Sequence, residues 1–261
     1  MEGESAPDLG PLSWRELIRA ALSYYRITFS RLAPISLVLG VILFFVPLAA
    51  FGLWGGETSE SLWVGIFIAR ESLFQLFASI IVALAGALIA AQVLGSRRTL
   101  AEVYSSLRPR RSDLLGSALY SMLLGGFAHL VPFLGLVLPL ILLGPPVLAQ
   151  VVAIEERPLS EARPRALSLF SGRMLKTFLF LLPVTLGLRL LEGVLYTAAL
   201  GAAAAAGWDP AALAVLQGIG SAAFMGLVAI PFLAALMAAL YFDMRARAGD
   251  LDEDALGVAV R

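Results

Sequence analysis

Long uncharged stretches alternate with short charged segments along the whole chain. Residues 32–54 and 72–95 carry no charge, and 177–200 contain only two charged side chains. Each stretch is long enough for a helix to cross the ~30 Å hydrocarbon core, which takes about 20 apolar residues. Residues 114–154 offer two more spans, and 211–242 contain a sixth. The pattern therefore predicts an all-α, polytopic membrane protein with six transmembrane helices.

Prolines and a glycine mark the middle of the longest uncharged stretch. The sequence PFLG at 132–135 permits a tight turn between the third and fourth spans. Pro139, Pro145 and Pro146 predict a kink or a break in the fourth span. Broken helices line the sites of transporters, but membrane helices also tolerate proline for structural reasons. Both interpretations stay open.

Positive charge is distributed unevenly between the connecting segments. Seventeen of the 19 Lys and Arg residues lie in 1–31, 96–113, 155–176 and 243–261. The loops after the first and fifth spans carry acidic residues and no cation. Because cytoplasmic loops are rich in Lys and Arg, we expect the four cationic segments and both termini to face the cytoplasm. The expected location is the cytoplasmic (inner) membrane of a bacterium.

Composition narrows the chemistry that the chain can perform. Hydrophobic residues make up 59% of the chain and charged residues 15%, against about 25% charged residues in soluble domains. Cys is absent and His129 is the single histidine, which excludes thiolate or multi-histidine metal sites and Cys nucleophiles. No phosphate-binding loop, carboxylate pair or nucleophile elbow stands out. We therefore expect no catalytic residues, metal or cofactor. A membrane-embedded lipid enzyme ranks third, behind the two functions given at the end of this section.

Each odd-numbered span follows a segment with the spacing of an amphipathic helix. Ser13 should cap the first, Thr99 and Glu102 form a capping-box pattern before the second, and Ser160 should cap the third. Pro109 should end the second helix. The expected apolar faces are Trp14, Leu17, Ile18, Ala21 and Tyr25; Leu100, Val103, Tyr104 and Leu107; and Ala162, Ala166, Leu169 and Phe170.

Helices that are apolar on one side and arginine-rich on the other lie at the lipid headgroups. The residues expected at the headgroups are Trp14, Arg15, Arg19, Arg26, Arg97, Arg98, Arg245 and Arg247. Residues 13–247 should form one membrane domain between two cytoplasmic tails, a disordered one at 1–12 and another at 248–261. The domain could consist of three units, 13–95, 99–154 and 160–242, each an interfacial helix followed by a transmembrane hairpin.

Four charges lie within or beside the apolar spans. Arg189 and Glu192 are three residues apart on the fifth span and so share one helix face. Arg70 and Glu71 lie near the outer end of the second span and could complete a charged cluster. Because intramembrane charge is costly, it suggests a functional site. We favour an ion-pair lock between helices over a substrate or proton site in an outward-facing cavity.

Small and amide side chains in the spans predict helix packing. Gly218, Ala222 and Gly226 recur every four residues on the sixth span. Such ridges let two backbones approach closely. Packing within the bundle is the favoured interpretation, and a homodimer face is the alternative. Gln150, in the fourth span, is expected to hydrogen-bond to a neighbouring helix.

Two regions carry a family resemblance. One comprises PPVLAQVVAIEE at 145–156 and RALSLFSG at 165–172, and the other is ALYFDMRAR at 239–247, continuing through Gly249-Asp250-Leu251. Together they resemble the six-span bacterial family named for the membrane domain of glycerophosphoryl diester phosphodiesterase. In the named enzymes a separate soluble domain performs hydrolysis. The motifs are not accompanied by such a domain here, so the resemblance implies no phosphodiesterase activity.

The tail motif also has a direct physical interpretation. Asp243, Arg245 and Arg247 follow the last span at its cytoplasmic end, where cations suit both the helix C-terminus and an anionic leaflet. Asp243 could pair with an arginine of a neighbouring interfacial helix. Anchoring is the favoured role of this motif, ahead of partner docking.

These observations favour a non-catalytic integral membrane protein. It would organise lipids or partner membrane proteins as an assembly subunit, and its partners would be membrane lipids, other membrane proteins or a second copy, but not nucleic acid. The alternative is a small-solute or lipid transporter that uses the intramembrane charges.

Overall fold

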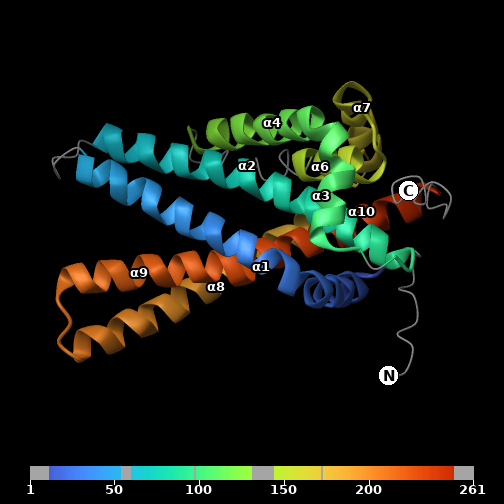
Figure 1. Cartoon of the computed structure of the whole chain (residues 1–261). Coiled ribbons are helices and arrows are strands. Elements are labelled where there is room, and N and C mark those ends of the chain that lie inside the picture. Colours follow the sequence, from blue (N-terminus) through green and yellow to red (C-terminus); the bar gives the residue numbers. More distant parts are fainter. Residues whose placement is uncertain (1–11, 54–59, 97, 131–143, 172, 250–261) are drawn as a thin grey trace.

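The computed structural model describes residues 12–53, 60–96, 98–130, 144–171 and 173–249 of the chain (Figure 1). Every regular element in these ranges is helical, which confirms the all-α class. The helices are α1 (Trp14–Leu53), α2 (Glu60–Val93), α3 (Leu100–Leu107), α4 (Arg111–Leu130), α6 (Gly144–Ile154), α7 (Leu159–Phe170), α8 (Met174–Ala205), α9 (Pro210–Phe224) and α10 (Ile230–Ala248). A 3-10 turn, Arg108–Arg110, joins α3 to α4, and a π-helical turn, Met225–Ala229, joins α9 to α10.

Four stretches of the described helices are long and apolar enough to cross a membrane. They are Trp14–Leu43, Ser72–Val93, Leu175–Ala205 and Ile219–Ala248. The protein therefore has the helices of a multi-pass membrane protein. The predicted third and fourth spans fall on α4, on 131–143 and on α6, and the PFLG turn and Pro139 lie outside the described residues. The count of six spans and the orientation stay predictions.

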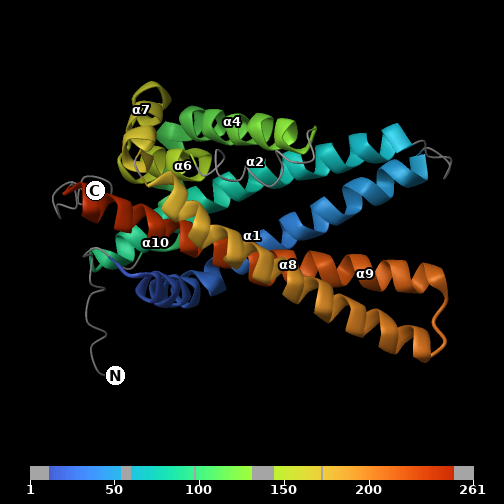
Figure 2. The same ribbon diagram turned by 180° about the vertical axis from the view of Figure 1, so that it is seen from behind.

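The arginine-rich elements gather at one end of the structure. The start of α1, both α3 and α7, and the end of α10 lie toward this end (Figures 1 and 2). The far ends of α1 and α2 and the turn between α8 and α9 lie toward the opposite end. We call the first the cationic end; the cations that it holds among the described residues include Arg98, Arg157, Arg165, Arg173, Arg245 and Arg247.

Helix α10 is the centre of the fold. It packs against α1, α2, α6 and α7, and its residues from Ala234 to Arg245 are buried without a break. A helix that is buried on every side needs small residues at its closest contacts, and the run contains Ala234, Ala235, Ala238 and Ala239. In the amide orientation that satisfies both of its polar atoms, Gln150 of α6 bonds to the α10 backbone at Met237 and Ala238.

Helix α1 crosses the π-helical turn at very short range. A Cβ at Gly226 would lie 2.6 Å from Leu37 Cα, and one at Gly40 would lie 2.5 Å from the Ala222 carbonyl oxygen. Ala222 and Gly226 thus face α1 of the same chain. The contacts of Gly218 are not among those that the structure describes. Only glycine permits such an approach of two backbones.

Proline explains the irregular turn between α9 and α10. Pro231 has no N–H group to donate to the carbonyl of Leu227, four residues earlier. The Tyr25 hydroxyl donates to this carbonyl instead, at 2.9 Å. A side chain of α1 therefore satisfies the backbone group that the π-helical turn leaves open.

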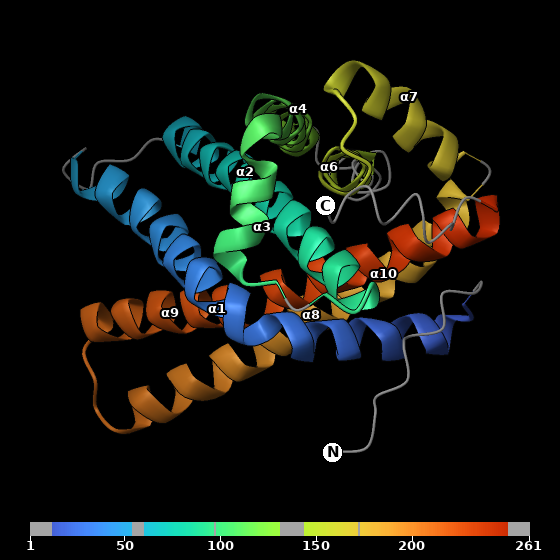
Figure 3. The same ribbon diagram turned by 45° about the vertical axis from the view of Figure 1, so that its right-hand side comes forward.

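The first predicted interfacial helix and the first span are one helix, not two. α1 begins at Trp14, directly after Ser13, whose N–H donates to the Glu16 carboxylate at 2.6 Å. The helix then continues to Leu53 with a bend (Figure 3). Pro34 within α1 removes a backbone donor to Ser30, which is a common physical cause of bending.

The predicted capping box of the second interfacial helix is confirmed. The Thr99 hydroxyl accepts from Glu102 N–H, and Thr99 N–H donates to the Glu102 carboxylate at 2.6 Å. This hydrogen bond lowers the pKa of Glu102 below its ordinary value, because it favours the ionised carboxylate. α3 ends at Leu107, and Pro109 lies in the 3-10 turn that follows, as predicted.

The third interfacial helix begins earlier than predicted. α7 starts at Leu159 with Pro158 at its N-cap, so the assignment of Ser160 as the cap is wrong. The Asp113 carboxylate of α4 accepts from Leu159 N–H at 2.9 Å, and a neighbouring helix thereby supplies the acceptor that a local cap would have offered. The predicted apolar face is confirmed in full, since Ala162, Ala166, Leu169 and Phe170 are all buried.

Candidate functional site

The tail motif places two pairs of polar side chains on opposite faces of α10. Tyr241 and Arg245 are four residues apart and share a face, as do Asp243 and Arg247. The two pairs are offset by two residues, which is a rotation of about 200° around the helix. The first pair meets Glu155, which directly follows α6, and the second meets the chain just before α1.

Glu155 lies at the centre of the first face, and its side chain is only 7% exposed. Tyr241 donates its hydroxyl to Glu155 Oε1 at 2.9 Å, and Arg165 Nε of α7 lies 3.2 Å from Oε2. Arg245 Nε lies 3.8 Å from Oε1, and Arg157 Nε lies 2.9 Å from Oε2. We call these five residues the Glu155 cluster.

The Glu155 cluster joins α6, α7 and α10 through one carboxylate. Arg245 is 3% exposed, and its guanidinium also lies 5.9 Å from the centre of the Tyr241 ring. A buried charge is costly unless it is paired, and removal of one partner leaves the other charge uncompensated. This closed, shielded geometry suits a structural fastening better than a binding site.

The second face forms an open site around Asp243. The Asp243 carboxylate accepts from Leu12 N–H at 2.7 Å and from Arg247 Nε at 2.9 and 3.0 Å. Arg247 also donates through Nη2 to the Leu12 carbonyl. These bonds hold the residue that precedes α1 against the end of α10. Asp243 therefore pairs with an arginine of its own helix, and its predicted pairing with a neighbouring interfacial helix is wrong.

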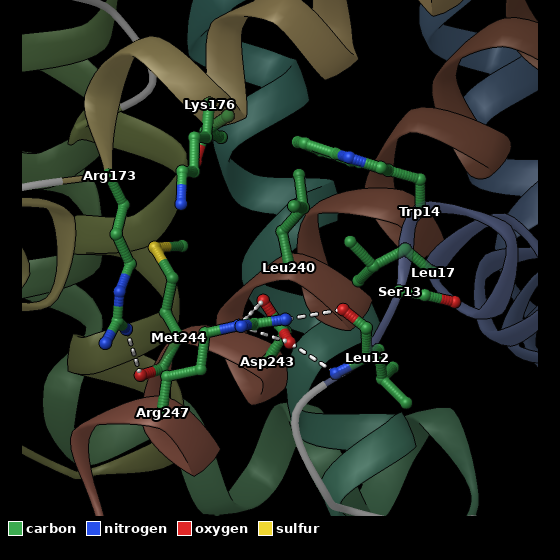
Figure 4. Close-up of a pocket in the computed structure, with 11 residues that line it drawn as sticks. Leu12, Ser13, Trp14, Leu17, Arg173, Lys176, Leu240, Asp243, Met244 and Arg247 are labelled. Carbon is green, nitrogen blue, oxygen red and sulfur yellow. Dashed lines mark hydrogen bonds and ion pairs between the residues drawn. The ribbon is translucent and has the colours of Figure 1, made fainter.

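A pocket of about 330 Å³ opens beside these contacts (Figure 4). The starts of α1 and α8 and the end of α10 enclose it, and we call it the Asp243 pocket. Arg173 donates Nη1 to the Met244 carbonyl at 3.0 Å. Lys176 also lines the pocket and makes no hydrogen bond or ion pair with the described residues. The apolar lining comes from Leu12, Trp14, Leu17, Leu240 and Met244.

Several residues of these two sites are not among the site residues that the sequence predicts. Glu155, Arg165 and Tyr241 belong to the conspicuous motifs at 145–156, 165–172 and 239–247, so the motifs themselves were the available signal. Lys176 is the one lysine of the chain, and this rarity is a second signal in the sequence. Arg245 was expected at the headgroups but lies buried against Glu155, whereas Arg15, Arg19 and Arg26 are exposed.

Of the four predicted intramembrane charges, the structure describes only the side chain of Glu192. Glu192 of α8 accepts from the Ser221 hydroxyl of α9 at 2.8 Å and lines a pocket of about 230 Å³ with Tyr196. The side chains of Arg70, Glu71 and Arg189 lie outside the description. The four-residue cluster therefore stays a prediction. The described residues contain no group of three His, Asp or Glu side chains that could hold a metal ion.

The fold defines an all-α protein whose long apolar helices can cross a membrane and whose charged motifs converge on α10. Comparisons with known protein families, with characterised proteins and with solved structures find no match. The resemblance to the six-span family consequently stays a prediction.

Proposed function

We propose that this protein is a non-catalytic, multi-pass protein of the bacterial cytoplasmic membrane that organises lipids or partner membrane proteins. The cationic end would face the cytoplasm, as the distribution of Lys and Arg favours. In this proposal α10 and the helices packed on it form a rigid body, and the α8–α9 hairpin provides the working surface.

The exposure of α8 carries this proposal. Only 12% of its most apolar stretch is buried, against 67% in the stretch that includes α10. Leu175, Leu190 and Val194 are 65–70% exposed. A large apolar flank of this kind needs lipid or a protein partner to cover it. The dense core on the other side supports a fixed scaffold more than a moving carrier.

Gentle purification from native membranes, followed by mass spectrometry of retained lipids and proteins, tests the proposal. A photo-crosslinking amino acid at Leu190 should capture the retained species in a constant ratio to the protein. The same group at Leu123 of α4, which is 55% exposed, is the matched control and should label bulk lipid only. Recovery of a lone monomer without partner or lipid would overturn the proposal.

Transport is the second candidate, and Glu192 is the observation that favours it. Its carboxylate lies well inside a long apolar helix beside a pocket, and intramembrane carboxylates commonly mark ion or substrate pathways. Exchanging Arg189 and Glu192 with each other separates the roles. A swap that keeps thermal stability but abolishes solute flux into liposomes supports transport, whereas loss of stability alone supports an ion-pair lock.

A further inference from the structure

We infer that the Asp243 pocket binds the phosphate group of an anionic phospholipid, with the start of the lipid's apolar part against the pocket wall. This inference deepens the proposed function, on which it rests, by naming one lipid class and one site. It is carried by the charge of the pocket, by the division of its lining into polar and apolar sides, and by its position.

The pocket has more positive than negative charge. Among the described residues that line it, Arg173, Lys176 and Arg247 are cationic and Asp243 is the single carboxylate. Asp243 is already engaged with Arg247 and Leu12, so it does not neutralise the other two cations. The excess charge suits an anion, and guanidinium and ammonium groups are the usual protein partners of phosphate.

Two of the cations that line the cavity keep unused donors. Arginine has five N–H donors, and Arg173 uses one of them, toward Met244 O. Lys176 carries three donors, and Figure 4 shows its ammonium group extending into the space between Arg173 and Met244. α8 begins at Met174 with no side-chain cap and no acidic residue in its first turn, which favours an anion at this helix end.

The rest of the lining is apolar and lies where an acyl chain would leave a headgroup. Trp14 stacks on Phe180 of α8 with ring centroids 4.8 Å apart. Leu17 and Leu240 continue this wall toward the membrane-spanning parts of α1 and α10. Tryptophan is typical of the membrane interface, so the wall and the cations together match an amphiphile with a charged head.

The size of the pocket limits the ligand to a headgroup and its nearest atoms. A volume of about 330 Å³ is at the lower end of small-molecule pockets, which span about 300–1,000 Å³. The acyl chains of a phospholipid must therefore continue outside the pocket along α1 and α8. The site would fix lipids by their phosphate and leave the chains in the bilayer.

Binding of dioctanoyl phosphatidic acid to the full chain in a neutral detergent tests the inference by calorimetry. Dioctanoyl phosphatidylcholine probes the need for net negative charge, and glycerol 3-phosphate probes a soluble source of the same phosphate. We expect tight binding of phosphatidic acid, weaker binding of phosphatidylcholine and no measurable binding of glycerol 3-phosphate. Equal affinity for the soluble ester would overturn the lipid assignment.

Variants then locate the binding. Lys176→Gln should weaken phosphatidic acid about fivefold, since one basic residue near an anionic surface contributes about that much, and Lys176→Arg should retain it. Arg108→Gln removes an exposed cation at the same end but outside the pocket, so it is the matched control and should bind as wild type. Equal affinity in wild type and Lys176→Gln would overturn the site.

Failure of this inference and failure of the proposed function give different results. Lipid that co-purifies equally with wild type and Lys176→Gln would reject the pocket while the lipid-organising role stands. Absence of any retained lipid or partner from both would reject the proposed function itself. Lys176 makes no hydrogen bond with the described residues, so Lys176→Gln should fold, and an unchanged melting temperature verifies this.

Discussion

At the cationic end, each of the two faces of α10 carries a carboxylate paired with arginine, but the surroundings of the two carboxylates differ. On one face, Glu155 is 7% exposed and sits among three arginines and a tyrosine. On the other, the Asp243 side chain is 9% exposed, but Arg247 is 38% exposed and a cavity lies beside it. The helices close around the first carboxylate and leave a space beside the second.

This difference separates charges that stabilise from charges that can bind. Where the helices meet closely, as α6, α7 and α10 do at Glu155, cations surround a shielded carboxylate, and removal of that carboxylate takes a charge partner from the buried Arg245. Where a cavity remains beside a partly exposed cation such as Arg247, the pairing of that cation contributes less to stability. Arginine content alone therefore does not distinguish a structural ion pair from a candidate binding surface. A cavity beside the arginine does distinguish them.

Removal of the Glu155 charge should have the largest effect. Glu155→Gln removes the carboxylate that lies 3.8 Å from Arg245, whose side chain is 3% exposed, so we expect a loss of about 3–5 kcal/mol in the free energy of unfolding. Equilibrium unfolding in mixed micelles measures this loss. Glu156→Gln removes the same charge from the next residue, which makes no hydrogen bond or ion pair with the described residues, and should cost less than about 1 kcal/mol. Equal losses in the two variants would show that the cluster is not a fastening.

The local helix features of the cationic end can be predicted from the sequence. The tertiary contacts between its helices cannot. The capping box of Thr99 and Glu102 and the buried face of α7 depend on residues three or four apart, so spacing predicts them. The approach of Glu155 to Tyr241 joins residues 86 positions apart, and it depends on which helices are neighbours. Composition and periodicity carry no such information.

The errors have the same physical origin. Ser160 is a good local cap, but Asp113 of α4 reaches the start of α7 from another part of the chain. Arg245 has the pattern of a headgroup cation, but α6 covers the face of α10 on which it lies. In both cases a tertiary contact overrides a correct local preference. The Asp243 pocket is built from three segments distant in sequence, so it too could be found only in the folded chain.

Loss of the Asp243 charge should have a smaller effect than loss of the Glu155 charge. Asp243→Asn can still accept from Leu12 N–H, and the partly exposed Arg247 can turn to water. We expect a loss of about 1–2 kcal/mol in the free energy of unfolding, measured in the same micelles. Glu161→Gln, at an exposed position of α7, is the charge-matched control. Because Asp243→Asn raises the excess positive charge of the pocket, affinity for phosphatidic acid should rise or stay constant. A loss as large as that of Glu155→Gln would remove the distinction between the two faces.

The smallest effect should come from the exposed member of the Glu155 cluster. Arg157 Nε lies 2.9 Å from Glu155, closer than either Arg165 or Arg245, but its side chain is 44% exposed. If burial rather than distance decides the contribution of an ion pair, Arg157→Gln should cost less than about 1 kcal/mol in the free energy of unfolding. Arg165→Gln, whose side chain is 20% exposed, is the comparison and should cost more. The opposite order, with Arg157 the more important, would mean that proximity to Glu155 outweighs shielding from solvent, and the contrast between the closed and the open face of α10 would then need another cause.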